Sequence, residues 1–143
     1  MRKKIFSKTR ERTLSPVIGK HVFGNLYDVE DNYLRDLDFV KKTVTEAANI
    51  GNMHIVDVLA RQFDSLDSPD VGGVSVIALI LESHISIHTW PEARYMTVDI
   101  YSCGKDSRPG VAFDYILSIF KPVEGRPVYC RDCYMKRKSE GRL

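Results

Sequence analysis

The short connections between consecutive β-rich segments restrict the fold of this chain more than any other feature. Residues 74–81 and 84–88 are typical of strands and only two residues separate them. A further strand is expected at 95–102, where apolar and polar side chains alternate. Parallel neighbours need a crossover of about a dozen residues, whereas a tight turn can join antiparallel neighbours. The sequence therefore predicts a largely antiparallel sheet.

Two helices and further strands complete the expected order. A helix capped by Asp31 or Asn32 runs to about Ile50 and ends at Gly51, and Pro109 begins a second helix that runs through about residue 120. The remaining segments are assigned to strands at 17–29, 53–63 and 127–130 and to a loop at 64–73. The order β-α-β-β-β-α-β predicts an α+β fold, a two-layer sandwich of a mainly antiparallel sheet with two helices.

Length and composition indicate one soluble domain over residues 1–143. Hydrophobic residues make up 43% and charged residues 28%, as in ordinary globular proteins. No apolar run approaches the roughly 20 residues of a membrane helix, and the N-terminus lacks a secretory signal, so we expect a cytoplasmic protein that does not bind membranes. Three cysteines, Cys103, Cys130 and Cys133, are too few for a disulfide scaffold.

Charge is segregated along the chain. Residues 1–15 carry six Lys/Arg against one Glu, and residues 126–143 carry six against two acids. The stretch 16–125 is acidic, with nine basic and sixteen acidic residues. Without interleaved aromatics the basic tails are interpreted as solvated ends rather than as a nucleic-acid site. The acidic body favours a small cationic substrate.

The densest polar cluster in otherwise apolar sequence is residues 82–92, Glu-Ser-His-Ile-Ser-Ile-His-Thr-Trp-Pro-Glu, directly after the uncharged strand 74–81. Its bland interpretation is a strand with one exposed polar face, because His84, Ser86 and His88 alternate with isoleucines. Its functional interpretation is a site, since burying such side chains is unfavourable unless they are satisfied or used. The pattern alone leaves both open.

Two other chemistries are weaker. A Ser-His hydrolase lacks a G-x-S-x-G elbow, and Asp99 is the only nearby strand carboxylate that could orient a histidine. A metal site at His84 and His88, which share one face of a strand, stays an alternative, but we assign no metal. The C-x2-C at Cys130 and Cys133 is at best half of a zinc site, and no function is assigned there.

Four motifs carry a resemblance to a known family. They are Gly19-Lys20-His21-Val22, Gly73-Val74-Ser75-Val76, the eleven residues 82–92, and Tyr101-Ser102-Cys103-Gly104. In this order and spacing the chain closely resembles the prokaryotic-type S-adenosylmethionine decarboxylase proenzymes over roughly residues 17–122. The two tails are not hallmarks of that family.

The resemblance implies that the chain cuts itself between Glu82 and Ser83, giving a β fragment 1–82 and an α fragment 83–143. Ser83 would become a pyruvoyl group, the only cofactor expected, which forms a Schiff base with the substrate amine and acts as electron sink. His88 would be the proton acceptor and Ser75 a second participant in processing, while Cys103 would donate a proton during catalysis.

Geometry sets a condition on this chemistry. In a fully extended strand Ser83 and His88 would lie about 16 Å apart on opposite faces. We therefore expect the chain to turn between them and the Glu82–Ser83 junction to sit at a bend, where backbone strain would assist the attack of the serine hydroxyl on the Glu82 carbonyl.

The resemblance also implies a substrate and partners. S-adenosylmethionine is the expected substrate, with Phe63 against its sulfonium and Glu92 a candidate contact, whereas His21 is expected to be structural. The alternative is arginine, the substrate of archaeal family members, and a rival class is a non-catalytic regulatory paralogue. We expect a homodimer or higher assembly of cleaved α and β fragments, with no nucleic-acid partner.

Overall fold

Seven antiparallel strands form one sheet in the part of the chain that the computed structural model describes, residues 19–65, 69, 71–125 and the backbone of 128–131. Their order is β2-β3-β4-β5-β1-β6, with β7 also beside β1. The strands are β1 (Lys20–Tyr27), β2 (Ile55–Asp64), β3 (Val71–Ile80), β4 (Ser83–Trp90), β5 (Tyr95–Ser102), β6 (Glu124–Gly125) and β7 (Val128–Arg131).

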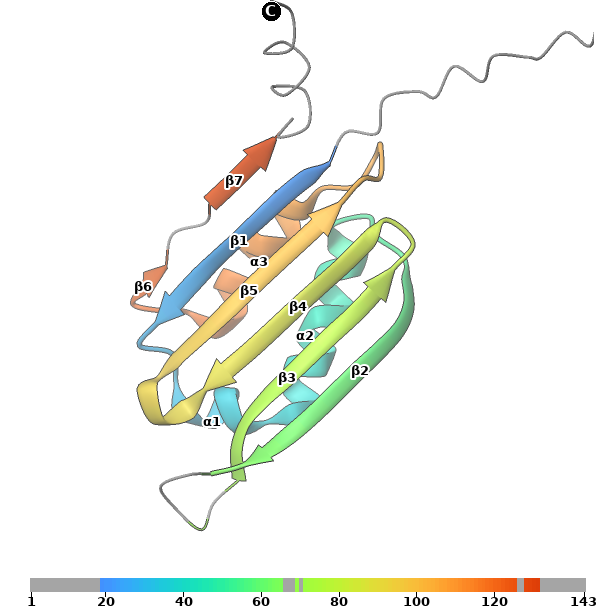
Figure 1. Cartoon of the computed structure of the whole chain (residues 1–143). Helices are drawn as coiled ribbons and strands as arrows, with labels where there is room; N and C mark the ends of the chain where they lie inside the picture. Colours follow the sequence, from blue (N-terminus) through green and yellow to red (C-terminus); the bar gives the residue numbers. More distant parts are fainter. Residues whose placement is uncertain (1–18, 66–68, 70, 126–127, 132–143) are drawn as a thin grey trace, which may run out of the picture.

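The helices lie on one face of this sheet, behind it in Figure 1. They are α1 (Asp31–Arg35), α2 (Leu37–Ile50) and α3 (Pro109–Phe120), with a single 3-10 turn, η1 (Pro91–Ala93), between β4 and β5. Helix α2 packs on β2, β3 and β4, and α3 packs on β1 and β5. The predicted two-layer α+β sandwich is therefore confirmed.

The predicted first helix is divided in two. Asp36 adopts an extended conformation between α1 and α2, and its carboxylate accepts a hydrogen bond from the backbone N–H of Phe39 at 2.9 Å. An aspartate in this position caps a new helix rather than continuing the old one. The expected end of α2 at Gly51 is confirmed.

The core lies between the helices and the inner face of the sheet. Ile85 and Ile87 of β4 are fully buried there, together with Ile100 of β5. Phe113 and Ile116 of α3 complete this contact and are also fully buried. Burying such side chains contributes roughly 1.5–3 kcal/mol each, so the alternation of β4 fixes which of its faces is turned to the helices.

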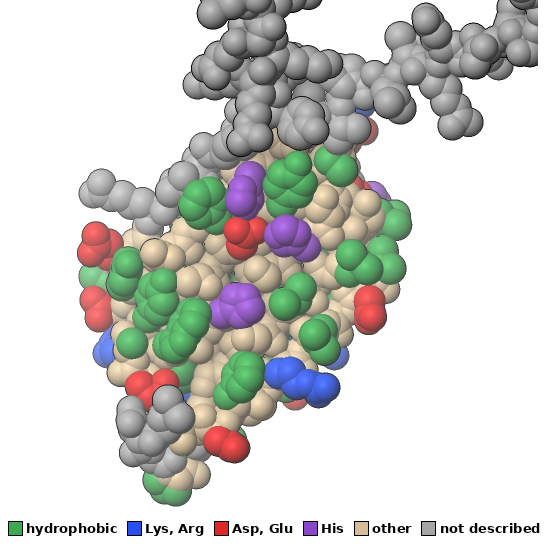
Figure 2. Space-filling view, viewed as in Figure 1, with side chains coloured by type: hydrophobic (Ala, Val, Ile, Leu, Met, Phe, Trp, Pro, Cys, Tyr) green, Lys and Arg blue, Asp and Glu red, His purple; other side chains and the backbone are tan. Residues whose placement is uncertain are grey.

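None of the described helices lies on the outer face of the sheet, where hydrophobic side chains are spread among polar ones (Figure 1 and Figure 2). We call this surface the outer face and define its apolar part by six exposed side chains of β2, β3, β4 and β5: Leu59, Phe63, Ile77, Leu79, Trp90 and Tyr101. Exposed apolar side chains gathered on one face of a sheet are typical of an interaction surface.

Some boundaries differ from the sequence prediction. The loop expected at 64–73 is shorter, because β2 continues through Asp64 and β3 begins at Val71. The two-residue strand β6 was not predicted, and the last predicted strand is found at Val128–Arg131. Among the described helices, none is long and apolar enough to cross a membrane.

Candidate active site

The proposed cleavage junction lies in the turn between β3 and β4. Leu81 and Glu82 connect Ile80 to Ser83, and these two are paired across the hairpin. The backbone N–H of Leu81 donates to the carbonyl of His54 at 2.9 Å, which attaches the turn to the chain before β2. The expected bend at the junction is confirmed.

The chain does not, however, turn between Ser83 and His88. Strand β4 is continuous from Ser83 to Trp90, so the expectation of a turn within it is wrong. The buried side chains of Ile85 and Ile87 keep this segment extended against the core. The chain reverses its direction before Ser83, at Leu81 and Glu82.

Ser83 has a backbone conformation that L-residues rarely adopt. Its φ is 149°, the largest positive value among the five described non-glycine residues with positive φ. Such a conformation costs on the order of 1–3 kcal/mol and persists only where the surrounding structure enforces it. Here the neighbours are the hairpin turn on one side and Ser102 of β5, with which Ser83 is paired, on the other. The strain therefore sits at the residue expected to react.

Cys103 contacts the carbonyl that precedes Ser83. The oxygen of Glu82 accepts a hydrogen bond from the backbone N–H of Cys103 at 2.9 Å and another from its Sγ at 3.2 Å. The same Sγ lies 3.9 Å from the Ser83 hydroxyl oxygen, and Cys103 is exposed. A thiol, a hydroxyl and a polarised carbonyl thus meet where β4 begins and β5 ends.

The side chain of Glu82 is held by His54, which the sequence analysis did not identify. One carboxylate oxygen is hydrogen-bonded to Nδ1 of His54 at 2.6 Å, and the other accepts the His54 backbone N–H at 3.0 Å. Burial raises the pKa of the Glu82 carboxyl, but the hydrogen bonds from His54 outweigh it, so that pKa lies below the ordinary value of 4.5. Glu82 is therefore held as a carboxylate.

Ser75 and His88 form a second group, away from the first. They are opposite each other in β3 and β4, and the Ser75 hydroxyl is hydrogen-bonded to Nδ1 of His88 at 2.7 Å. His88 lies five residues along β4 from Ser83, a separation of about 16 Å in an extended strand. The structure brings Ser83, Glu82 and Cys103 together, and Ser75 and His88 together, but not the two groups within one chain.

A pocket of about 440 Å³ opens beside this second group. Phe63 and Glu92, both named from the sequence, line it together with Ser75 and His88. The other four lining residues were not anticipated, among them Asp64 at the end of β2 and Trp90 at the end of β4. The composition of the strands does not predict these residues, because they line the pocket only when the ends of β2 and β4 lie on either side of β3 in the folded sheet.

His21 and His84 flank Asp99 on the outer face (Figure 2), where histidine side chains gather around an acidic one. Each Nε2 lies 2.9 Å from one oxygen of the Asp99 carboxylate. Asp99 thus orients His21 and His84, and no bond to His88 is formed. Within the described residues no group of three or more His, Cys, Asp or Glu could hold a metal ion.

Several known proteins are similar to this chain. The sequence family described as S-adenosylmethionine decarboxylase matches residues 20–128. A relative from Caldivirga maquilingensis, named arginine decarboxylase proenzyme, is 51% identical over 106 residues, covering 74% of this chain and 77% of its own. One from Pyrobaculum arsenaticum with the same name is 47% identical over 116 residues, covering 81% and 85%. The crystal structure of the adenosylmethionine decarboxylase from Aquifex aeolicus is 28% identical, with a TM-score of 0.70, covering 81% and 91%.

The chain belongs to the S-adenosylmethionine decarboxylase family. It is a decarboxylase, a carbon–carbon lyase, so the prediction of an enzyme is confirmed. A second family, described as a probable treble clef zinc finger, matches residues 120–138 and includes Cys130 and Cys133. The side chains of this C-x2-C lie outside the described part of the structure, so the expectation that no function is assigned there is not tested.

Proposed function

We propose that this chain cuts its own backbone between Glu82 and Ser83 and uses the resulting pyruvoyl group to decarboxylate a cationic amino acid. The single observation that carries the proposal is the geometry of the junction, where a strained Ser83 follows a carbonyl held by two donors of Cys103. Gly104 lies close to the residue before the junction as well, because a Cβ on Gly104 would lie 2.6 Å from Cγ of Glu82.

Self-cleavage begins with Ser83. Its hydroxyl oxygen attacks the Glu82 carbonyl carbon, and the carbonyl oxygen becomes an oxyanion that the Cys103 N–H is placed to stabilise at 2.9 Å. The bond from that carbon to the Ser83 nitrogen then breaks and leaves an ester. A base removes the α-proton of Ser83, and the bond from its β-carbon to the ester oxygen breaks, so that the α-carboxylate of Glu82 leaves and residue 83 becomes dehydroalanine. Water then hydrolyses the imine tautomer of this residue, which gives the pyruvoyl group and releases ammonia. Release of strain at Ser83 favours the first step.

His88 and Ser75 are the proposed groups for the α-proton and the oxyanion, but within one chain they are too far away. Their hydrogen bond fixes the imidazole, since one ring nitrogen is engaged with the serine hydroxyl. A second copy of the chain must therefore bring His88 and Ser75 to Ser83. This requirement supports the expected homodimer.

The outer face supplies the surface for that dimer. It carries the six exposed apolar side chains named above together with His88 and the His21–Asp99–His84 cluster, and no described helix covers it. Two such sheets can pack face to face about 10 Å apart. The two-fold axis of such a dimer would lie between the two sheets, perpendicular to β4 and level with its middle. It would place the Ser83 end of one β4 over the His88 end of the β4 in the partner chain. Each dimer then has two identical composite sites.

The pyruvoyl carbonyl supplies the electrophile and electron sink for loss of carbon dioxide. Cys103 is the proposed proton donor to the substrate's α-carbon, because its thiol is exposed and lies beside Ser83. The β fragment ends at Glu82, whose side chain stays attached to His54 after cleavage. The new chain end is thereby retained at the site.

The 440 Å³ pocket supports a cationic substrate. Phe63 and Trp90 are 53% and 46% exposed and offer aromatic faces to a cation. Asp64 and Glu92 add carboxylates, and among the described residues no Lys or Arg lies within ion-pair distance of Asp64. Planar guanidinium groups pair with carboxylates through two parallel hydrogen bonds and stack on aromatic rings.

Arginine is the substrate that we propose first, because the relatives that are about half identical to this chain are named arginine decarboxylase proenzymes. The second candidate is S-adenosylmethionine, which the sequence analysis placed first. It is supported by the family description and by the name of the structural neighbour. Both cations suit the same pocket.

The two candidates are separated by carbon dioxide release from carboxyl-labelled arginine and carboxyl-labelled S-adenosylmethionine, measured side by side with the mature protein. We expect turnover of arginine, with kcat/KM for S-adenosylmethionine lower by about 10²-fold or more. A preference for S-adenosylmethionine would reverse the order, and turnover of neither would contradict the proposed function. The Ser83→Ala chain is the control for contaminating activity.

A further inference from the structure

The loop that carries Cys103 is held by a network of hydrogen bonds of its own. Ser102 is fully buried and its hydroxyl donates to the Ser107 hydroxyl at 2.6 Å. The Ser107 hydroxyl in turn donates to the carbonyl of Gly104 at 2.8 Å, and the Gly104 N–H donates to the Ser102 hydroxyl at 3.3 Å. These bonds fold the loop back on itself directly after Cys103.

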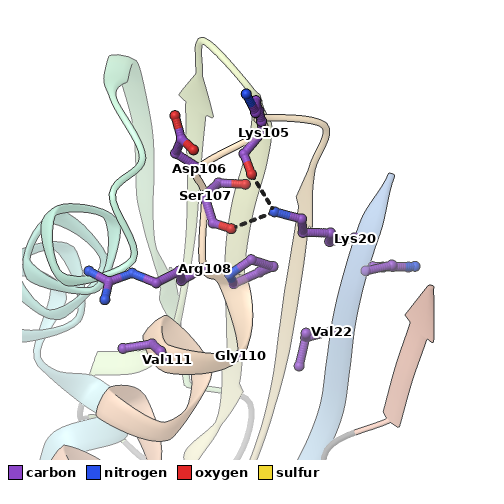
Figure 3. Close-up of a pocket in the computed structure, with 10 residues that line it drawn as sticks. Lys20, Val22, Lys105, Asp106, Ser107, Arg108, Gly110 and Val111 are labelled. Carbon is purple, nitrogen blue, oxygen red and sulfur yellow. Dashed lines mark hydrogen bonds between the residues drawn. The ribbon is translucent and has the colours of Figure 1, made fainter. Parts of the chain in front are cut away.

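Lys20, on the neighbouring strand β1, donates hydrogen bonds to the backbone of this loop. Lys20 of β1 is paired with Ser102 of β5, and Figure 3 shows its side chain directed at the loop backbone. The ammonium group donates to the carbonyl oxygens of Gly104, Lys105 and Ser107 at 3.2, 3.0 and 2.8 Å. An ammonium group has three donors, so its hydrogen-bonding capacity is used completely.

The ammonium group of Lys20 binds these three carbonyl oxygens and forms no ion pair with a described residue. Among the described residues no carboxylate lies within 4.0 Å of its Nζ. The two other cations that line the adjacent cavity of about 340 Å³ do not share this task. Lys105 is exposed, and Arg108 points toward α2, where it donates to the carbonyl of Ile50 at 3.2 Å (Figure 3).

The position of this loop decides how Cys103 meets the scissile carbonyl. The Cys103 N–H must stay within hydrogen-bond distance of the Glu82 oxygen while that oxygen becomes an anion. Gly104 touches the Glu82 side chain as well, since a Cβ there would lie 2.6 Å from its Cγ. A displacement of about 1 Å can cost 10²-fold in rate when it misplaces a reacting group.

We propose that Lys20 is a positioning residue for self-cleavage: its ammonium fixes the Gly104–Ser107 backbone and thereby aims the Cys103 N–H at the carbonyl oxygen of Glu82. This inference rests on the proposed function, because it assumes that Glu82–Ser83 is the bond that breaks. Lys20 itself contacts neither Glu82 nor Ser83. Its role is to hold another residue in place.

The test compares Lys20→Gln with Lys105→Gln, which removes the same charge from the same cavity without touching the three bonds. In full-length chains that also carry Ser83→Ala, hydrogen exchange at the amides of Cys103 and Ser107 should be about tenfold faster for Lys20→Gln. With Ser83 intact, its first-order rate of self-cleavage should fall about tenfold or more. Lys105→Gln should match the parent in both measurements.

An unchanged cleavage rate in Lys20→Gln would overturn the proposal, with or without faster exchange. Should Lys20→Gln fail to fold, Lys20→Arg replaces it, since a planar guanidinium cannot donate to three converging carbonyls in the same way. Slower cleavage of that variant supports the proposal, and the parent rate contradicts it. If the parent chain itself does not cleave, the proposed function fails, and the exchange arm alone then decides whether Lys20 holds the loop.

Discussion

The carbonyl oxygen of Glu82 accepts two hydrogen bonds from Cys103, one from its backbone N–H at 2.9 Å and one from its Sγ at 3.2 Å. One residue thus offers two donors with separable functions. A side-chain substitution removes the thiol but leaves the backbone donor in place.

Cys103→Ala should therefore separate self-cleavage from decarboxylation. Cleavage should continue at a reduced rate, because the backbone N–H still faces the Glu82 oxygen. Decarboxylation by the cleaved protein should fall by about 10²-fold or more, since the proposed proton donor is gone. Gel analysis of the fragments and carbon dioxide release measure the two steps. Equal loss of both would contradict the separation of the two roles, and loss of neither would show that the thiol acts in neither step.

The His54–Glu82 contact predicts a pH dependence of stability. The pKa of Glu82 is lower in the folded chain than its ordinary value of 4.5, so its stabilising contribution is complete above that value and is lost as the pH falls through the folded one. His54→Ala removes the Nδ1 bond but keeps the backbone bond. It should destabilise the uncleaved Ser83→Ala chain by on the order of 1 kcal/mol at pH 7 and less below pH 4.

Urea unfolding of the Ser83→Ala chain, with and without His54→Ala, at several pH values measures this difference. Lys41→Ala, an exposed substitution on α2, serves as the control and should show no such trend. A destabilisation that grows as the pH falls would have the wrong sign for this account.

The composite site predicts complementation between two inactive chains. Ser83→Ala and His88→Ala should each be inactive as homodimers. In a mixed dimer one site combines both substitutions, while the other combines an intact Ser83 with an intact His88 of the partner chain. Co-expression in equal amounts should recover roughly a quarter of the parental activity. Ser83 and Cys103 of one site come from the same chain. Co-expression of Ser83→Ala with Cys103→Ala should therefore recover no activity.

Thr89 predicts a cost in stability at a buried connection. Its hydroxyl is buried, donates to the carbonyl of Leu34 at 2.6 Å and accepts the N–H of Val74 at 2.8 Å. Thr89→Val should destabilise by about 1–3 kcal/mol and lower Tm by several degrees, because both partners lose a bond in the interior. Thr43→Val is a matched buried control and should cost less, since the Thr43 hydroxyl only donates to Phe39 within its own helix. Calorimetry that ranks the two the other way would contradict this.

The sequence was sufficient for the sheet, because alternation and short connections leave few arrangements. The pairing of Ser75 with His88 was not predicted, because the strand ends expected at Leu81 and His84 would place Ser75 opposite Trp90. A two-residue turn places Ile80 opposite Ser83, and five further positions along each strand give Ser75 opposite His88. Register follows from turn length once the strand ends are known.

Other contacts had no such pattern to reveal them. His54 meets Glu82 across 28 residues and Lys20 meets the Cys103 loop across more than 80. These contacts depend on which strand ends lie together in the folded sheet, and neither periodicity nor composition encodes that. Lys20 does stand in one of the four family motifs, which marks its position but not its partners.

The central claim, self-cleavage after Glu82, is tested most directly by mass spectrometry of the purified full-length chain and of its Ser83→Ala variant. The account predicts fragments of 82 and 61 residues from the parent, the second beginning with a pyruvoyl group that blocks sequencing, and one intact chain of 143 residues from the variant. An intact parent with an ordinary serine at position 83, or a variant that still cleaves, would contradict it.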